Sequence, residues 1–422
     1  MNYKDYMKKE LIPAFGCTEP IALAYAAAKA SEILEEKPEK IKSKLSGNII
    51  KNAHSVKVPG TDGRKGIEIS LVSGALYGDA SKELQVLENM DKSKLSEADE
   101  LIKDGIVEME LMPNVSNLYI EVEAIKGDNS AIVILEKDHT NIVKILKNNE
   151  VIFEKKEENT DDGNVEFSFE KIYDFAKNED YSDIKYLLDD QINYNIAIAN
   201  EGIENSWGSN IGSIILKTSK DDFVEKMVAY ASAGSDARMS GCEKPVVINS
   251  GSGNQGITVS VPIIIYAREK NFSDDELYRA LIFANLLGLY LKQGIGKLSA
   301  YCGVVSASSA AVAGIAFLEK EEKSIIKETL SNSLAGNSGL ICDGAKPSCA
   351  MKIASSLRNA FLAYDQAKFK ESFEAGDGIV MNSLEETMES VGRIARYGMK
   401  STDEVILNEM LGNKEYIKEF EK

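Results

Sequence analysis

The pattern of apolar and polar residues divides the chain into three stretches with different periods. The first 36 residues repeat with the period of a helix, and Thr18 has the composition of a helix cap, with Glu and Pro directly behind it. Between residues 116 and 154, apolar and polar positions alternate, which is the period of a half-buried strand. From about residue 191 onward, long segments rich in Ala, Gly and Ser return to the helical period. The expected order is therefore helix, then strands, then many helices.

The alternating stretch predicts an antiparallel meander. Short polar turns interrupt it at residues 126–130, 138–141 and 148–150. Turns as short as these join neighbouring strands that run in opposite directions. The following segment, 154–190, is acidic and rich in Asn and Asp, so we expect a linker between domains there.

Together these patterns predict an α+β fold, with an N-terminal α/β region that contains the meander and an all-helical domain after it. We expect residues 1–38 to form an N-terminal helix that packs on the helical domain, residues 39–185 to form the α/β domain, and residues 186–422 to form the helical domain. The main helices of the last domain are expected at 191–202, 223–234, 274–293, 298–322, 349–369 and 405–411. Their small residues suit close helix packing and equally suit contacts between the subunits of a homo-oligomer.

Composition and charge narrow the choice of partners. Of the 422 residues, 44% are hydrophobic and 27% are charged, which is ordinary for a folded globular protein. The 67 Asp and Glu residues outnumber the 49 Lys and Arg residues, and the net charge is -18. Nucleic acid and anionic membranes both need a basic face, so neither is an expected partner. The charge-free stretch 298–318 has the length of a membrane span, but its Ala, Gly and Ser content favours a buried helix. We expect a cytoplasmic protein.

The cysteines carry the first candidate chemistry. Five cysteines and two histidines exclude a complete disulfide framework and a histidine-rich metal site. Cys302, Cys342 and Cys349 flank expected helix starts, where the helix dipole favours the thiolate that binds metal. Three thiolates without an obvious fourth ligand suit an iron–sulfur cluster with one open iron, which could act as a Lewis acid. The alternative is that these cysteines are small apolar residues of a helical core.

Cys17 also precedes an expected helix, in the segment FGCTEP, so its pKa should be depressed. It is a candidate for a reactive thiol or for an exchangeable fourth ligand, and the alternative is an ordinary turn cysteine. Cys242 has no partner pattern, so we expect a structural role.

Two further segments are rich in groups that hold anions. The loop NSGSGNQG, residues 249–256, offers backbone N–H groups and polar side chains that suit a carboxylate or phosphate. The upstream Arg238 suits a carboxylate in a bidentate contact. The alternative is a glycine-rich connection between helices. The candidate substrate-binding residues of the loop are Asn249, Ser250, Ser252 and Asn254.

The turn DHTN places His139 where it could orient or deprotonate a substrate, with Thr140 and Asn141 beside it as candidate binding residues. The plainer interpretation is that Asp and Asn form the turn and that the histidine is exposed. Lys51 and Asn52 are a similarly ambiguous pair, which could belong to the site or have a purely structural role.

Taken together, these motifs resemble the L-cysteine desulfidase family, which is related to the iron–sulfur-dependent L-serine dehydratases. The matching segments follow the chain in order: GCTEPIALA at 16–24, KNxxxVxVPGT at 51–61, HTNIV at 139–143, SDARM at 235–239, NSGSGNQGI at 249–257, LSAYC at 298–302 and ICDGAKPSCAMK at 341–352. They spread over almost the whole chain, which makes the resemblance far more specific than any single motif.

The resemblance implies a [4Fe–4S] cluster on the three cysteines of the helical domain, with one open iron and no pyridoxal phosphate. The implied reaction is α,β-elimination, in which a small amino acid, L-cysteine, and water give pyruvate, ammonia and hydrogen sulfide. The sequence holds no cysteine after Cys349, whereas the serine dehydratases take a fourth ligand from the C-terminal tail, and Cys17 is the natural substitute. The candidate bases for the Cα proton are Cys17, Lys51 and His139.

Three alternatives stay open. The same cluster could act on L-serine, with hydroxide as the leaving group. A pyridoxal-phosphate lyase would need a Schiff-base lysine, and no lysine stands out for that role. Outside the enzymes, the cysteines could form a non-catalytic metal module that binds zinc or a closed cluster.

Overall fold

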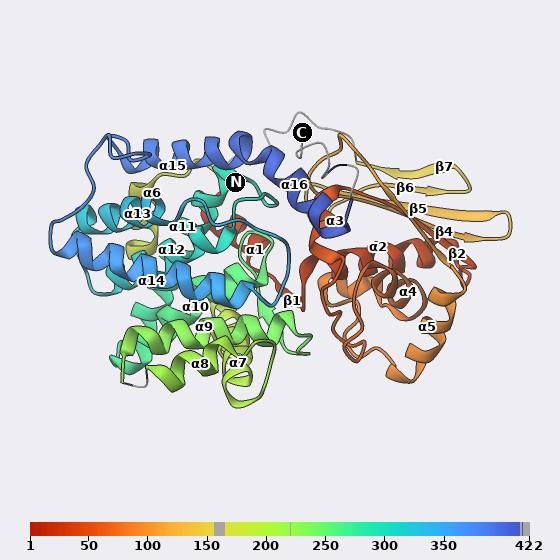
Figure 1. Ribbon diagram of the computed structural model, residues 1–422, viewed down its shortest axis with the longest axis horizontal. Helices are drawn as coiled ribbons and strands as arrows, with labels where there is room; N and C mark the ends of the chain where they lie inside the picture. The colour runs from red at the N-terminus through yellow and green to blue at the C-terminus, as the bar shows by residue number, and fades with distance from the viewer. Residues whose placement is uncertain (156–164, 220, 414–415, 417–422) are drawn as a thin grey trace.

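The protein consists of a part with a β-sheet and a helical part, which lie side by side in the computed structural model (Figure 1). The structure describes residues 1–155, 165–219, 221–413 and 416. The chain alternates between strands and helices in its first third and is helical from residue 169 onward, apart from the short strand β8. The expectation of an α+β fold with an N-terminal meander and a helical C-terminal region is confirmed.

The sheet has six strands in the order β3-β2-β4-β5-β6-β7. The strands are β2 (Lys40–Leu45), β3 (Val107–Leu111), β4 (Tyr119–Lys126), β5 (Asn129–Glu136), β6 (Ile142–Lys147) and β7 (Glu150–Glu154). Strands β4 to β7 are consecutive and antiparallel, as the short turns predict. Strands β2 and β3 pair in parallel through a helical connection, which the sequence pattern did not indicate.

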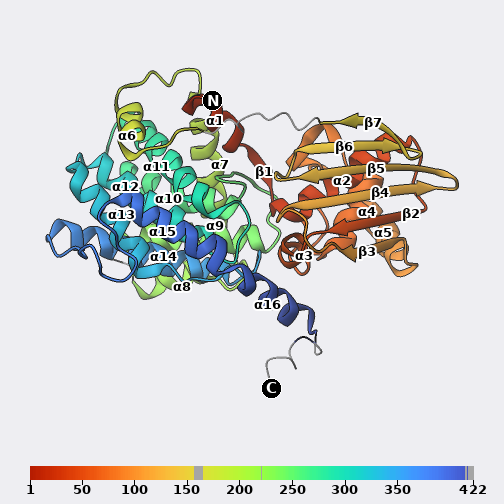
Figure 2. The same ribbon diagram turned by 90° about the horizontal axis from the view of Figure 1, so that it is seen from above.

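Helices α2 (Thr18–Leu34), α4 (Ile67–Tyr77) and α5 (Leu95–Lys103) cover one face of the sheet (Figures 1 and 2). The residues of α2 are buried on almost every side, because the helix lies between α4 and strands β4 and β5. We expected the first helix to pack on the helical domain. In the structure α2 packs on the sheet, whereas α1 (Tyr3–Glu10) contacts the helical part. The almost uniformly apolar surface of α2 has no polar face that would identify one partner.

The helical part is built from long helices that cross at close range. They are α7 (Lys185–Glu204), α8 (Ile211–Thr218), α9 (Phe223–Met239), α10 (Gly253–Glu269), α11 (Asp274–Ile295), α12 (Gly303–Leu318), α13 (Lys323–Asn337), α14 (Cys349–Lys368) and α15 (Leu384–Arg393). The charge-free stretch predicted as a buried helix contains α12, which is buried along nearly its whole length. Among the described residues, no helix is long and apolar enough to cross a membrane.

Two segments that the sequence predicts as connections are partly helical in the structure. Residues 156–164 of the predicted linker 154–190 lie outside the described residues, but α6 (Phe169–Asn178) occupies much of the rest and packs on α11. In the predicted loop 249–256, helix α10 already begins at Gly253. The β-branched run and Pro262 inside α10 conceal its helical character, which depends on burial between α9 and α12.

Two short elements join the parts and position the site. Strand β1 (Pro13–Phe15) pairs with β8 (Pro245–Val247), so the start of α2 lies beside the start of α10. At the other end of the chain, α16 (Lys400–Leu411) crosses from the helical part and packs on α3 (Gly47–Ala53), as Figure 1 shows. The first turn of α2 therefore contacts both the end of α3, through Glu19 and Asn52, and the loop before α10, through Thr18 and Gly251.

Candidate functional site

Cys302 and Cys342 are brought together by a short antiparallel bridge between two loops. Tyr301 pairs with Ile341, the amide of Cys302 donates to the carbonyl of Leu340 at 2.9 Å, and the amide of Cys342 donates to Ala300 at 2.6 Å. The two thiols are hydrogen-bonded to each other. The hydrogen bond from Cys302 lowers the pKa of Cys342 to about 6, and nearby Lys51 acts in the same direction.

Cys349 completes a group of three cysteines. It is the first residue of α14, and Cys302 caps α12, so each lies at a helix N-terminus as the sequence predicts. The charge of Cys349 affects the pKa of Cys302, which places the three thiols in one neighbourhood. Burial nevertheless raises the pKa of Cys349 to about 11, so the helix dipole alone does not produce a thiolate there.

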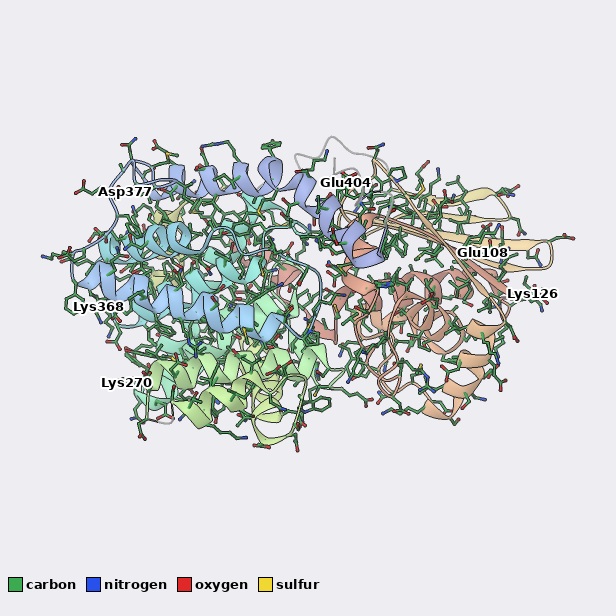
Figure 3. All side chains as sticks on the ribbon, viewed as in Figure 1. Glu108, Lys126, Lys270, Lys368, Asp377 and Glu404 are labelled. Carbon is green, nitrogen blue, oxygen red and sulfur yellow. The ribbon has the colours of Figure 1, made fainter. Side chains whose placement is uncertain are left out.

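Four lysines surround these cysteines and influence them electrostatically. Lys51 is paired with Asp403 of α16 and donates to the carbonyl of Cys342 at 3.2 Å. Lys346 donates to the hydroxyl of Ser55, and Lys352 is paired with Asp343. The fourth is Lys292 of α11, which is 3% exposed. Figure 3 shows how charged side chains such as Lys126 and Lys270 instead project from the periphery.

Glu19 links several of the predicted site residues around the start of α2. Its carboxylate accepts hydrogen bonds from the thiol of Cys17 at 3.1 Å, from Thr18 at 3.1 Å and from the amide of Asn52 at 2.9 Å. Its Oε1 lies 3.8 Å from Nε2 of His139. Burial alone raises the pKa of Glu19, but His139 and the hydrogen bond from Cys17 outweigh it and lower the pKa to about 2.

Cys17 is a neutral thiol in this arrangement. Burial raises its pKa well above the usual value, and the negative charge of Glu19 adds to that effect. The expectation of a depressed pKa was therefore wrong, because the dipole of α2 is weaker than burial and a neighbouring carboxylate. Cys17 also shares a small apolar cluster with Val56 and Met239, against which Cys349 packs. This cluster connects Cys17 with the three cysteines.

Arg238 is a buried cation beside this group. It lies in the last turn of α9, is 3% exposed, and donates from Nη1 to Oδ1 of Asn254 at 3.2 Å. Its Nε has no hydrogen-bond partner, and no ion pair joins Arg238 to a carboxylate in the described parts of the chain. A Cβ on Gly253 would lie 2.3 Å from Nε, so only glycine leaves room for the guanidinium at the start of α10. Its charge also influences Cys17.

Other predicted binding residues have local partners. Ser252 caps α10, and the amide of Asn249 donates to Asn285. Ser250, in the same loop, is buried and has a positive φ of 50°. Thr140 and Asn141 lie in the turn between β5 and β6, where the amide of Asn141 donates to the carbonyl of Glu136 at 2.8 Å. His139 of the same turn is 1% exposed, contrary to the plainer expectation of an exposed histidine.

Sequence reasoning did not single out Glu19 or Lys292. Glu19 was considered only as a first-turn residue of its helix, and the signal available was its place in the segment GCTEP beside Cys17. Lys292 is the one charged residue in the run LLGLYLKQGIG, and Gly288 and Ile295 lie on the same helix face. A lone lysine on an apolar face is a signal of burial, but the sequence does not show which charge faces it.

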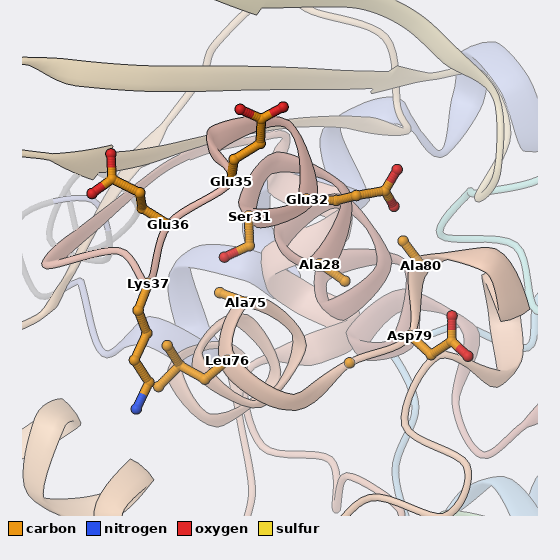
Figure 4. A pocket seen from close by; sticks show the side chains of 11 residues that line it. Ala28, Ser31, Glu32, Glu35, Glu36, Lys37, Ala75, Leu76, Asp79 and Ala80 are labelled. Carbon is orange, nitrogen blue, oxygen red and sulfur yellow. The ribbon is translucent and has the colours of Figure 1, made fainter.

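Two surface cavities lie away from this group. One, of about 540 Å³, is lined by the ends of α2 and α4, with the carboxylates of Glu32, Glu35 and Asp79 around it (Figure 4). The other, of about 580 Å³, is lined by the turn 57–63 and by Cys242, but by none of the other four cysteines. Neither cavity is lined by one of those four cysteines.

Comparisons with known proteins agree on one family. Residues 81–408 match the model of the serine dehydratase alpha chain. A UPF0597 protein of Finegoldia magna is 45% identical over 419 residues, which cover 97% of this chain and 99% of that protein. A UPF0597 protein of Lachnoclostridium phytofermentans is 45% identical over 96% of this chain and 98% of that protein. A UPF0597 protein of Porphyromonas gingivalis is 34% identical over 97% of this chain and 97% of that protein.

Proposed function

The chain belongs to the serine dehydratase alpha chain family, and on that premise we propose that it is an iron–sulfur lyase that converts L-cysteine and water to pyruvate, ammonia and hydrogen sulfide. One observation carries the proposal. Three buried polar atoms without a hydrogen-bond partner surround Cys17 and Glu19, and they match the three parts of an α-amino acid. They are Nε of Arg238, Oδ1 of Asn52 and Nε2 of His139.

The residues fit a cysteine-ligated cluster. Among the described residues, no three His, Cys, Asp or Glu side chains are arranged to hold a single metal ion. A cluster distributes its cysteines over separate irons. Cys302 and Cys342 are hydrogen-bonded to each other, Cys349 interacts electrostatically with both, and cationic lysines lie near them. When bound through three cysteines, a [4Fe–4S] cluster keeps one iron open, and this iron supplies Lewis acidity to the departing sulfur.

The chain's own residues bind and orient the substrate. Arg238, with an unused N–H and no carboxylate partner among the described residues, holds the substrate carboxylate. Oδ1 of Asn52 accepts a hydrogen bond from the substrate ammonium, while the amide of Asn52 stays on Glu19. These two contacts direct Cα and the side-chain sulfur toward the cysteines.

Of the three candidate bases, His139 has the most suitable surroundings. Lys51 is paired with Asp403, and Cys17 is a thiol that donates to Glu19. His139 has a free Nε2 facing the site, and the carboxylate of Glu19 stabilises the imidazolium that forms when Nε2 takes the Cα proton. Sulfide leaves with the electrons of its C–S bond, and the resulting aminoacrylate tautomerises and hydrolyses to pyruvate and ammonia.

L-Serine is the second candidate substrate, because the matched family is named for serine dehydratase. The apolar cluster of Cys17, Val56 and Met239 favours cysteine, since a hydroxyl leaving group would find few hydrogen-bond partners beside it.

The test is anaerobic purification and cluster reconstitution, followed by assays of pyruvate and sulfide with both amino acids. We expect sulfide and pyruvate in equal amounts from L-cysteine. Pyruvate from L-serine without sulfide from L-cysteine would replace the proposed substrate, and a protein that binds zinc but no iron would overturn the proposed chemistry.

A further inference from the structure

Lys292 differs from the other lysines near the cysteines because it has no partner. Lys51 and Lys352 are paired with carboxylates, and Lys346 donates to a hydroxyl and a carbonyl oxygen. No hydrogen bond or ion pair joins the ammonium of Lys292 to another group within the described residues. It is nevertheless 3% exposed, on a helix that is buried on most sides. A buried cation without a counter-charge is strongly destabilising, so its presence needs a reason.

The surroundings of Lys292 indicate what its partner is. Lys292 lies on α11, which packs on the next helix, α12, and Cys302 caps the start of α12. The short loop between the two helices also binds Cys342, whose amide donates to the carbonyl of Ala300 in that loop. The charges that act on Lys292 accordingly come from Cys342, Cys302 and the cation of Lys51. Lys51 repels it, whereas the two sulfurs attract it when they are ionised. Lys292 lies in the last turn of α11, where a cation is favoured by the dipole, but a helical side chain points back toward the N-terminus and away from the terminal carbonyls.

We propose that Lys292 is the counter-charge of the iron–sulfur cluster, a positioning residue whose ammonium gains its ionic partner only when the cluster is bound. The proposal rests on the cluster named in the proposed function. Three thiolates around a [4Fe–4S] core would leave a net negative charge, and the buried ammonium of Lys292 would offset it. The same charge stabilises the reduced, more negative state of the cluster, and so raises its reduction potential.

Lys297 offers a matched control only five positions further along the chain. It is also largely buried, but it is paired with Glu10 at 3.1 Å and with Asp138. Replacing Lys297 by Met leaves two carboxylates without their cation, and this lowers the stability of the protein with or without a cluster. Replacing Lys292 by Met removes an unpaired charge and so raises the stability of the cluster-free protein. The two variants therefore have opposite effects on the stability of the cluster-free protein.

The experiment compares wild type, Lys292→Met, Lys292→Arg and Lys297→Met, each with and without reconstituted cluster. Without the cluster, we expect Lys292→Met to raise the melting temperature and Lys297→Met to lower it. With the cluster, Lys292→Met should lose iron to a chelator about tenfold faster and shift the midpoint potential to a more negative value. Lys292→Arg, which keeps the charge, should return the potential toward that of wild type.

Two results overturn the proposal. A lower melting temperature of cluster-free Lys292→Met, together with unchanged iron loss, would mean that Lys292 only packs in the helical core. An unchanged midpoint potential in that variant would mean that its charge does not face the cluster. If wild type itself binds no iron, the proposed function fails. If wild type binds iron and only the Lys292→Met results differ from those expected, the role of Lys292 alone fails, so the two failures are distinguishable.

Discussion

Replacing Glu19 by Gln removes one negative charge from the centre of the site and keeps the shape of the side chain. In the folded protein the pKa of this carboxyl falls from 4.5 to about 2, because His139 and the thiol of Cys17 together outweigh the effect of burial. Each pKa unit corresponds to about 1.4 kcal/mol, so the ionised carboxylate contributes about 3 kcal/mol to the free energy of unfolding at neutral pH. The variant should lose a similar amount.

The pH dependence of this loss follows from the direction of the shift. A carboxyl with a lowered folded-state pKa stabilises the protein fully above its unfolded pKa, and that contribution disappears as the pH falls toward the folded pKa. The difference between wild type and Glu19→Gln should therefore be fully present at pH 5 and shrink by about 1.4 kcal/mol per unit between pH 4.5 and pH 2.

The assay is urea denaturation of the cluster-free protein at pH 7, pH 5 and pH 3, followed by far-ultraviolet circular dichroism. Glu108→Gln is the matched control, because Glu108 forms an ion pair with Lys40 on the surface, where solvent and salt screen the interaction and little stability depends on it. A loss in Glu19→Gln that is equally large at pH 3 and pH 7 would refute the reasoning, since it would come from shape or hydrogen bonding and not from the charge.

Three further predictions concern the site. Arg238→Met should lower kcat/KM about a hundredfold through loss of the carboxylate contact, as measured by steady-state sulfide release; an unchanged KM would remove Arg238 from the substrate site. Gly253→Ala should raise KM, because its Cβ would displace the guanidinium and its contact with Asn254, while circular dichroism shows a retained fold. Cys302→Ala should lose iron by colorimetric analysis, whereas Cys242→Ala should keep iron and activity, and equal iron in both would contradict the assignment.

Much of the fold could be predicted from the sequence because its signals are local. The alternation of Ile120 and Val122 with polar neighbours, and turns of a few residues, are sufficient for the meander. The start of α14 at Cys349 and of α11 at Asp274 agree with the helical period and its caps. The pairing of β2 with β3 was not predictable, since these strands are far apart in sequence and alternation within each strand does not identify its partner.

The candidate site, like the fold, could be predicted from the sequence only in part. Its motifs are visible in the sequence, and the segments LSAYC and ICDGAKPSCAMK single out Cys302, Cys342 and Cys349 as candidate ligands. The protonation state of Cys17, in contrast, could not be predicted. Its helix start predicts a lowered pKa, whereas burial and Glu19 raise it, and burial depends on packing between Cys17 and segments such as the one at Val56.

The sequence by itself determined the α+β class, the order of the main elements and the candidate residues for the chemistry, because period, capping and motif composition are properties of neighbouring residues. Only the tertiary structure decided which charges have partners. Lys292 and Lys297 belong to one short stretch, yet Lys297 is paired with Glu10 and Asp138, whereas Lys292 has no hydrogen-bond or ion-pair partner in the described part of the chain. The partner of a buried charge is set through space, by segments that folding brings together from distant positions, so no local pattern can contain it.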